Sequence, residues 1–192
     1  MTKRGKTVLL CAALLFLVAL MAAVNLPGSP LGDRRTPSGS GSAGSAVGEI
    51  LPDFTVTLTD GSRFTLSEQT QAGRTVVLNI WATWCAPCVK ELPYFDRLAR
   101  ERGDVSVLAL HSDLVTEDVE AFLAGLDCPS LPFAVDPDGE VTALLGGDAV
   151  LPRTVVVSPE GIVLYNAAGS VTYEQLTELA DRSGSGSPSP VG

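Results

Sequence analysis

The chain has 192 residues and a formal net charge of −9, from 13 basic and 22 acidic residues. The first 35 residues hold five of the basic residues and one of the acidic ones, so the remainder carries 8 against 21, a net charge of −13. A segment that acidic repels phosphate backbones. We therefore expect no nucleic-acid partner.

The N-terminus combines positive charge with an apolar run. Three basic residues within positions 1–6 precede an uninterrupted apolar stretch from Val8 to Val24. This stretch is short for a membrane span of about 20 residues but longer than the usual signal-peptide core of about 7–15. We favour an uncleaved anchor at residues 7–25 over a cleaved signal, because Ala22-Ala23 is a poor cleavage pattern. Either interpretation leaves positions 1–6 cytoplasmic and exports the rest.

Two other segments have the composition of flexible chain. Residues 26–47 and 183–192 are rich in Gly, Ser and Pro. They bury too little apolar surface to offset the entropy lost on ordering. We expect a flexible linker and a disordered tail on either side of one folded domain at residues 48–182, which is long enough for a single hydrophobic core.

Strand-like and helix-like patterns alternate within this domain. Asp60-Gly61 is a tight-turn signal between two short β patterns, and the later apolar run interrupted only by Asn79 is typical of a buried central strand. The next helix should end at Gly103 and be kinked by Pro93. Thr116, followed by acidic residues, marks another helix start.

The expected strands are 54–58, 63–66, 76–82, 105–110, 133–135, 154–158 and 162–166, and the expected helices are 86–102, 116–126, 140–145 and 173–182. Two pairs of strands are joined by short turns and are predicted to form hairpins. This order predicts an α/β fold with a central mixed sheet that has helices on both faces and an N-terminal β-hairpin.

The motif Cys85-Ala86-Pro87-Cys88 directly follows the predicted central strand. If a helix begins near Cys85, its N-terminal amides and dipole stabilise a thiolate there, and Cys88 lies one turn along on the same face. One sulfur can then attack a disulfide, and the other can resolve the mixed disulfide. The spacing predicts a redox-active dithiol.

Two other uses of the cysteine pair stay open. A structural disulfide that closes four residues would stabilise the fold by only about 2 kcal/mol. A metal site would lack a second set of close ligands, since the domain adds only Cys128 and His111, although two thiolates can hold a cuprous ion. We favour redox catalysis, keep a copper-binding module as the alternative, and expect no separate cofactor or resident metal.

Several motifs occur in the order found in one protein family: Leu51–Phe54, the run from Asn79 to Cys88, Glu91–Pro93, and Leu151–Thr154. In them the chain resembles the thioredoxin superfamily, and within it the membrane-tethered, extracytoplasmic TlpA/ResA-like thiol-disulfide oxidoreductases. The resemblance covers residues 47–182 and implies a thioredoxin-like fold. Residues 116–135 would form the central helix-strand insert of this branch.

The resemblance implies a role for each residue around the dithiol. Cys85, partly exposed at the helix start, would be the nucleophile, and Cys88 would resolve the mixed disulfide. Ala86 and Pro87 would contact substrate and tune the thiol pKa by limiting amide donors. Trp84 would pack over the sulfurs and shield them, or else lie at the rim of the site.

Glu91 matches a glutamate that the family places near its thiols. A partly buried carboxylate there would have a raised pKa and could exchange the proton of Cys88. The alternative is a solvated helix glutamate paired with arginines. Ordinary thioredoxins carry a buried aspartate where this chain has Asn79, so that proton route is absent and more depends on Glu91.

Pro152 matches the family's cis-proline, whose loop lies beside the dithiol and leaves the backbone of Leu151 free to pair with an extended substrate. Arg153 departs from the threonine common at that place, so it either alters which partner docks or is an exposed loop arginine. Cys128 is expected to be a buried packing residue rather than a regulatory thiol. His111 is expected to be a satisfied loop histidine rather than a catalytic base.

Together these features predict a monomeric protein-disulfide reductase outside the cytoplasm, held to the membrane by residues 7–25, or secreted if that segment is cleaved. The expected clients are disulfide-bearing exported proteins such as apocytochrome c. The family implies an electron donor of the thiol-transfer type in the membrane. The direction stays open, because a dithiol oxidase differs from a reductase in redox potential.

Overall fold

The computed structural model describes residues 44–112, 119–146 and 150–182, which contain seven strands and five helices. The strands are β1 (Thr55–Thr57), β2 (Arg63–Thr65), β3 (Thr75–Trp81), β4 (Val105–His111), β5 (Phe133–Val135), β6 (Arg153–Val157) and β7 (Val163–Ala168). The helices are α2 (Leu66–Gln71), α3 (Ala86–Glu101), α4 (Val119–Ala124), α5 (Glu140–Leu144) and α6 (Tyr173–Asp181).

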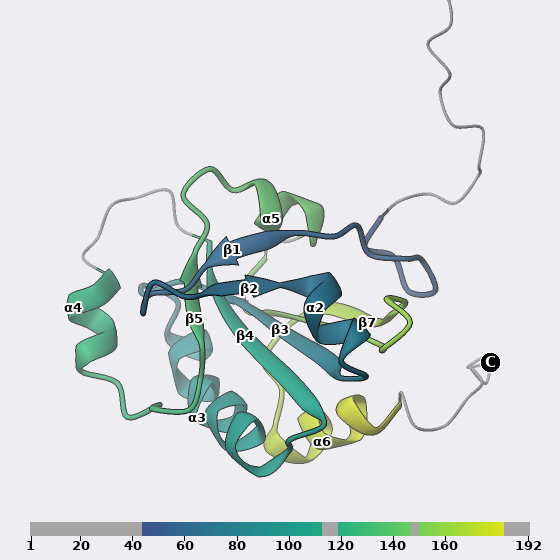
Figure 1. Cartoon of the computed structure of the whole chain (residues 1–192). Helices are drawn as coiled ribbons and strands as arrows, with labels where there is room; N and C mark the ends of the chain where they lie inside the picture. The colour runs from purple at the N-terminus through teal and green to yellow at the C-terminus, as the bar shows by residue number, and fades with distance from the viewer. Residues whose placement is uncertain (1–43, 113–118, 147–149, 183–192) are drawn as a thin grey trace, which may run out of the picture. The chain divides into compact units, whose positions relative to one another are not determined.

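A mixed sheet forms the centre of this fold (Figure 1), with strand order β5-β4-β3-β6-β7. Strand β3 pairs in parallel with β4 and antiparallel with β6, and all seven of its residues are buried. Strands β1 and β2 form a separate antiparallel hairpin. The predicted α/β class, the central mixed sheet and the N-terminal hairpin are confirmed.

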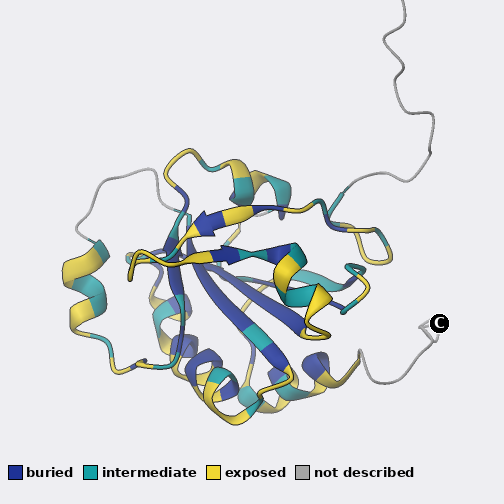
Figure 2. Ribbon diagram, in the orientation of Figure 1, coloured by how far each residue is buried: buried dark blue, intermediate teal, exposed yellow. Residues whose placement is uncertain are grey.

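The two faces of the sheet are covered by different elements, and the strands of the sheet are mostly buried, as their dark blue ribbons in Figure 2 show. On one face, α3 and α6 pack on apolar side chains of β3, β4 and β6. On the other face, the β1-β2 hairpin, α2 and α5 pack on the alternate residues of the same strands. Because successive strand residues point to opposite faces, neighbouring positions of β3 enter different halves of the core.

The predicted elements are found with their ends shifted by at most two residues where both ends are described. The expected cap Thr116 lies outside the described residues. Helix α2 is the element that sequence patterns did not predict. Its first turn depends on Asp53, whose carboxylate accepts hydrogen bonds from the Ser67 amide (2.8 Å) and hydroxyl (2.7 Å). The N-cap residue Thr65 makes no capping bond with its side chain, so the acceptor for the first turn comes from a residue 14 positions before Ser67.

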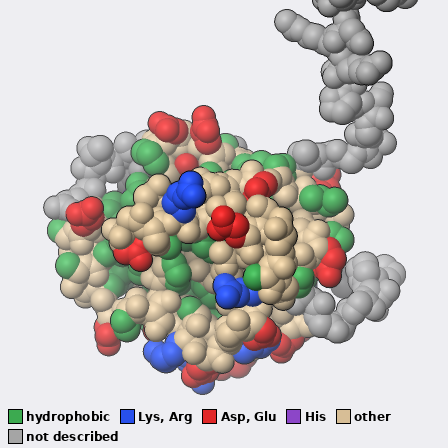
Figure 3. All heavy atoms as spheres, viewed as in Figure 1, with side chains coloured by type: hydrophobic (Ala, Val, Ile, Leu, Met, Phe, Trp, Pro, Cys, Tyr) green, Lys and Arg blue, Asp and Glu red, His purple; other side chains and the backbone are tan. Residues whose placement is uncertain are grey.

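The apolar stretch at 8–24, the proposed linker up to residue 43 and the tail from 183 lie outside the described residues. No helix within the described ranges is long and apolar enough to cross a membrane. On the face seen in Figure 3, acidic side chains are spread among a few basic ones, and the described residues there form no basic patch.

Helix α3 is tied to the chain that leads into β5 by one buried carboxylate. Asp96 accepts a hydrogen bond from the Ser130 amide at 2.7 Å and another from Arg100 at 3.1 Å, where the arginine side chain is more than half exposed. Charge-assisted bonds to a buried carboxylate are stronger than an exposed ion pair. The amide bond therefore carries most of the stabilisation.

We predict that Asp96→Ala lowers the free energy of unfolding by about 1–3 kcal/mol, because it leaves the partly buried Ser130 amide without its charged acceptor. Arg100→Ala removes only the exposed half of the arrangement and should cost at most about 0.5 kcal/mol. Urea unfolding of the two variants measures both values. Equal losses would show that the ion pair, not the amide bond, fixes α3.

Candidate active site

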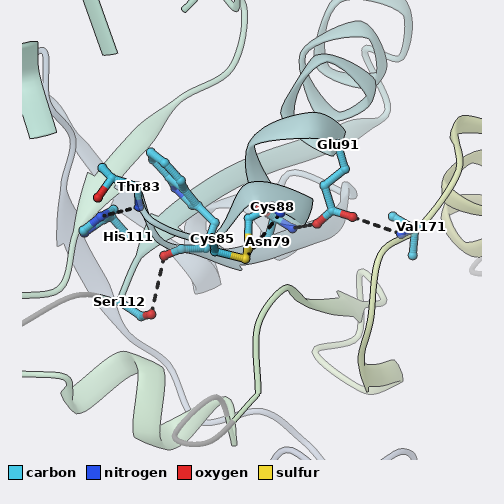
Figure 4. The surroundings of a disulfide bond; sticks show 9 residues. Asn79, Thr83, Cys85, Cys88, Glu91, His111, Ser112 and Val171 are labelled. Carbon is cyan, nitrogen blue, oxygen red and sulfur yellow. Dashed lines mark hydrogen bonds between the residues drawn. A yellow bond between two sulfur atoms is a disulfide. The ribbon is translucent and has the colours of Figure 1, made fainter. Parts of the chain in front are cut away.

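The two cysteines of the motif lie at the N-terminus of α3, just beyond the C-terminal end of β3 (Figure 4). Cys85 is the N-cap of the helix, and its sulfur accepts a hydrogen bond from the Cys88 amide at 3.4 Å. Cys85 and Cys88 form a disulfide, with Cα atoms 5.3 Å apart. After reduction, the same amide and the helix dipole favour a thiolate on Cys85.

The sulfurs are less exposed than the sequence indicated. Cys85 is only 4% exposed and Cys88 is fully buried, so the prediction of a partly exposed Cys85 is wrong for this disulfide form. The reason is packing, because both cysteines belong to the apolar cluster between α3 and the sheet. Ala86 and Pro87, between the cysteines, are exposed. Trp84 is 66% exposed, which favours the rim position over a shield on the sulfurs.

Glu91 lies one turn after Cys88 and points into the core. Its side chain is 1% exposed, so the alternative of a solvated helix glutamate is wrong. Its carboxylate accepts hydrogen bonds from Asn79 Nδ2 at 2.8 Å and from the Val171 amide at 3.0 Å. Burial raises the pKa of Glu91 to about 7, and the two donors oppose this rise without cancelling it. A carboxyl group with that pKa can accept or donate a proton near neutral pH.

Three separate elements bring this carboxyl group and its donors together. Glu91 comes from α3, Asn79 from the centre of β3, and Val171 from the turn before α6. Asn79 alternates with apolar residues of β3 and faces the same half of the core as α3. The sequence identified Asn79 as a departure from thioredoxin but not as a partner of Glu91. The Val171 amide left no signal in the sequence, because any residue supplies one.

The loop before β6 contains a cis peptide bond between Leu151 and Pro152, as the family resemblance implied. Because β6 runs antiparallel to β3 and Arg153 is paired with Ile80, this loop lies beside the end of β3 that leads to the cysteines. Pro152 is buried and Leu151 partly buried. Among the described residues, the Leu151 backbone has no hydrogen-bond partner.

Arg153 is not the exposed loop arginine that one interpretation predicted. It is the first residue of β6, is partly buried, and donates a hydrogen bond from Nη1 to Asn166 Oδ1 at 2.7 Å. Asn166 in turn donates to the carbonyls of Ser45 and Leu145. Arg153 therefore supports the chain around the cis-proline loop from inside the fold.

The remaining candidates behave as core residues. His111 ends β4 rather than lying in a loop, and its Nε2 accepts a hydrogen bond from the Thr83 amide at 3.2 Å. Cys128 is a free, buried cysteine, and burial, followed by the charges of Asp96 and Asp127, raises the pKa of its thiol to about 11. A thiol with that pKa is a poor nucleophile, which supports a packing role.

No group of three or more His, Cys, Asp and Glu side chains in the described part of the chain is placed to hold a metal ion. The arrangement consists of a buried disulfide, a helix N-terminus beside one sulfur, and the buried carboxyl group of Glu91 one helical turn beyond the other cysteine. These are the components needed to exchange a disulfide with another molecule and to move the accompanying proton.

Comparison with known proteins gives a consistent result. The family model described as Redoxin matches residues 46–181. The thiol-disulfide oxidoreductase ResA of Bacillus thuringiensis subsp. konkukian is 35% identical over 135 residues, which cover 69% of this chain and 75% of that protein. The thioredoxin-like protein YneN of Bacillus subtilis is 28% identical over 141 residues, which cover 70% and 78% of the two chains.

A solved structure with the same fold is that of the pneumococcal exposed lipoprotein thioredoxin Etrx1 from Streptococcus pneumoniae. It has a TM-score of 0.62 and 28% identity, and the match covers 68% of this chain and 99% of that one. A protein from Chlorobium tepidum described as a thiol:disulfide interchange protein DsbE also has a TM-score of 0.62 and 28% identity, with coverage of 72% and 97%.

The raised pKa of Glu91 predicts how stability depends on pH. Between about pH 4.5, the ordinary value, and about pH 7, the folded protein holds a proton that the unfolded chain has lost. Stability contributed by this group is therefore present at low pH and is lost as the pH rises through that window, by about 3 kcal/mol in total.

The measurement is the free energy of unfolding of wild type and Glu91→Gln across this window. The difference between the two should change by about 3 kcal/mol in favour of the glutamine variant as the pH rises. If the glutamine also changes the free energy of unfolding by an amount that does not depend on pH, the difference between the two proteins is offset equally at every pH and its slope is unchanged. A difference that stays flat between pH 4.5 and pH 7 would mean that Glu91 titrates as an ordinary carboxyl group.

Proposed function

Because this chain belongs to the redoxin family, within the TlpA/ResA-like branch of the thioredoxin superfamily, it is a thiol-disulfide oxidoreductase, and we propose that it reduces disulfides in exported proteins. One observation carries the proposal. The Cys85–Cys88 pair lies at a helix N-terminus with the buried Glu91, whose pKa is about 7, one turn beyond Cys88.

The reaction begins from the reduced dithiol. The Cys85 thiolate attacks one sulfur of the client disulfide, so that a Cys85–client bond forms while the client's own S–S bond breaks. The other client sulfur leaves as a thiolate. The helix N-terminus lowers the energy of the attacking thiolate, because its amides and dipole favour negative charge there.

The second step needs Cys88 to lose its proton. Glu91, in its ionised form, accepts the proton from the Cys88 sulfur, and this sulfur then attacks Cys85. The Cys85–Cys88 bond forms, the Cys85–client bond breaks, and the second client sulfur leaves as a thiolate. The client gains two electrons, the enzyme dithiol loses them, and the proton on Glu91 returns to solvent before the next cycle.

An extended client segment would meet two surfaces at this site. Trp84, Ala86 and Pro87 are exposed beside the dithiol and offer apolar contact. The Leu151 backbone, ahead of cis Pro152, offers hydrogen bonds to a main chain. Main-chain contacts do not depend on client sequence, which suits an enzyme that recognises an exposed disulfide rather than a single motif.

The location and the partners complete the proposal. An N-terminal segment with basic residues followed by the apolar stretch 8–24 supports a membrane anchor with the domain outside the cytoplasm. A monomer tethered there would meet exported proteins such as apocytochrome c. A membrane-bound thiol donor would return two electrons to the Cys85–Cys88 disulfide.

The trapping prediction follows from the two-step reaction. In Cys88→Ser the first step proceeds but the second cannot, so Cys85 should stay covalently bound to its client in cells. Mass spectrometry of adducts that dissociate with reductant should identify exported proteins with reducible disulfides. A background of Cys128→Ser excludes adducts through the buried third thiol.

Cys85→Ser with Cys88 intact is the matched control and should yield no comparable adduct. If neither single variant captures a protein, the proposal of a protein substrate fails. If cells lacking the enzyme accumulate the captured clients in reduced rather than disulfide-bonded form, the enzyme works as an oxidase and the reductase direction is wrong.

A further inference from the structure

Two buried polar atoms have no hydrogen bond among the described residues: Oδ1 of Asn79, the residue that donates to Glu91, and Oγ1 of Thr154. Both residues are completely buried. A buried polar group without a partner costs free energy, so such atoms need an explanation. The two atoms belong to residues that the strand register places next to each other.

Asn79 of β3 and Thr154 of β6 are directly opposite residues of an antiparallel pair. Opposite residues point to the same face of a sheet, with Cβ atoms about 4.5–5.5 Å apart. A rotation of the Thr154 side chain can therefore bring its hydroxyl to the Asn79 carboxamide. The other end of that carboxamide, Nδ2, already donates to Glu91.

A carboxamide has a donor at one end and an acceptor at the other, and a hydroxyl can act as either. We propose that Asn79 and Thr154 are positioning residues that let Glu91 gain and lose a proton inside the core, by exchanging the two ends of the Asn79 carboxamide. The inference rests on the function proposed above, because it assigns how the proton from Cys88 is held.

In each protonation state of Glu91, the Asn79 carboxamide then donates at one end and accepts at the other. With Glu91 ionised, Asn79 Nδ2 donates to Oε1 and the Thr154 hydroxyl donates to Asn79 Oδ1. With Glu91 protonated on Oε1, this oxygen donates to Asn79 Oδ1, and Nδ2 donates to Thr154 Oγ1. The Val171 amide stays on Oε2 in both states. A turn of the amide about its Cβ–Cγ bond converts one arrangement into the other.

The hydrogen bond from Asn79 is the contact of Glu91 that a side-chain rotation can change. Burial is the largest cause of its raised pKa, followed by the opposing hydrogen bonds from Val171 and Asn79, and no charged side chain contributes. On α3, Cys88 lies one turn before Glu91, and in the disulfide form it does not titrate. From β6 the neutral Thr154 faces it, and α6 presents the apolar Leu176 and Leu179.

The test compares Thr154→Val, which keeps the shape and removes the hydroxyl, with Thr154→Ser, which keeps the hydroxyl. The full chain is purified in mild detergent in its disulfide form. Infrared spectra are recorded between about pH 5 and pH 9. Subtraction of the Glu91→Gln variant isolates the carboxyl band of Glu91, and its intensity against pH gives the titration midpoint.

Thr154→Val should lower this midpoint by roughly 0.5–1 pH unit, because a buried N–H without an acceptor costs more than a carbonyl without a donor, and the protonated state then contains one more such N–H than the ionised state. Thr154→Ser should keep the wild-type midpoint. In wild type, NMR contacts between the Asn79 amide protons and the Thr154 methyl should be strong below the midpoint and weak above it.

An unchanged midpoint in Thr154→Val would overturn the inference, as would an equal shift in Thr154→Ser or pH-independent NMR contacts. Thermal melting confirms that each variant is folded. The measurement uses no client, so its failure would leave the thiol-disulfide exchange intact. A failure of the proposed function would instead appear in the trapping of clients by Cys88→Ser, whatever the midpoint.

Discussion

The burial of one carboxyl group, that of Glu91, is the constraint on which this site depends. Taking a carboxylate out of water is costly unless it is hydrogen-bonded, and the protein meets that cost with Asn79 and the Val171 amide. The bonds are sufficient to keep the group in the core but not to restore its ordinary pKa. Glu91 therefore changes its protonation state near neutral pH, at one end of the dithiol.

The same helix gives the two cysteines different environments. Cys85 caps α3, where amides and the dipole favour a negative sulfur, whereas Cys88 lies one turn inside and is fully buried, one turn before Glu91. An attacking sulfur benefits from being ionised in advance, while a resolving sulfur benefits from keeping its proton until the mixed disulfide has formed. The positions of the two cysteines on α3 support the proposed division of roles between them.

The sequence predicted well what depends on local pattern. The elements alternate as expected because apolar periodicity and turn residues such as Asp60-Gly61 act over a few positions. The cis bond before Pro152 came from the family resemblance, since sequence patterns alone do not distinguish it. Helix α2 was missed because the carboxylate that bonds its first turn, that of Asp53, lies 14 positions before Ser67 in the chain.

The details that decide the chemistry needed the structure. The bond between Asn79 and Glu91 joins residues whose contact depends on how α3 packs on β3, and the Val171 donor is a backbone atom 80 positions away from its acceptor. The burial of Cys85 follows from its packing in the apolar cluster between α3 and the sheet rather than from its neighbours in sequence. Residue types indicated the site, and tertiary packing determined its protonation.

The most direct test is the rate at which Cys88 resolves a mixed disulfide preformed on Cys85, followed by stopped-flow against pH in wild type and Glu91→Gln. If Glu91 takes the proton of Cys88, the wild-type rate rises with pH to a plateau through a midpoint near 7. The glutamine variant should lose that midpoint and resolve roughly 10²–10⁴-fold more slowly at neutral pH. Identical rate profiles for the two proteins would contradict the assignment of Glu91 as the proton acceptor.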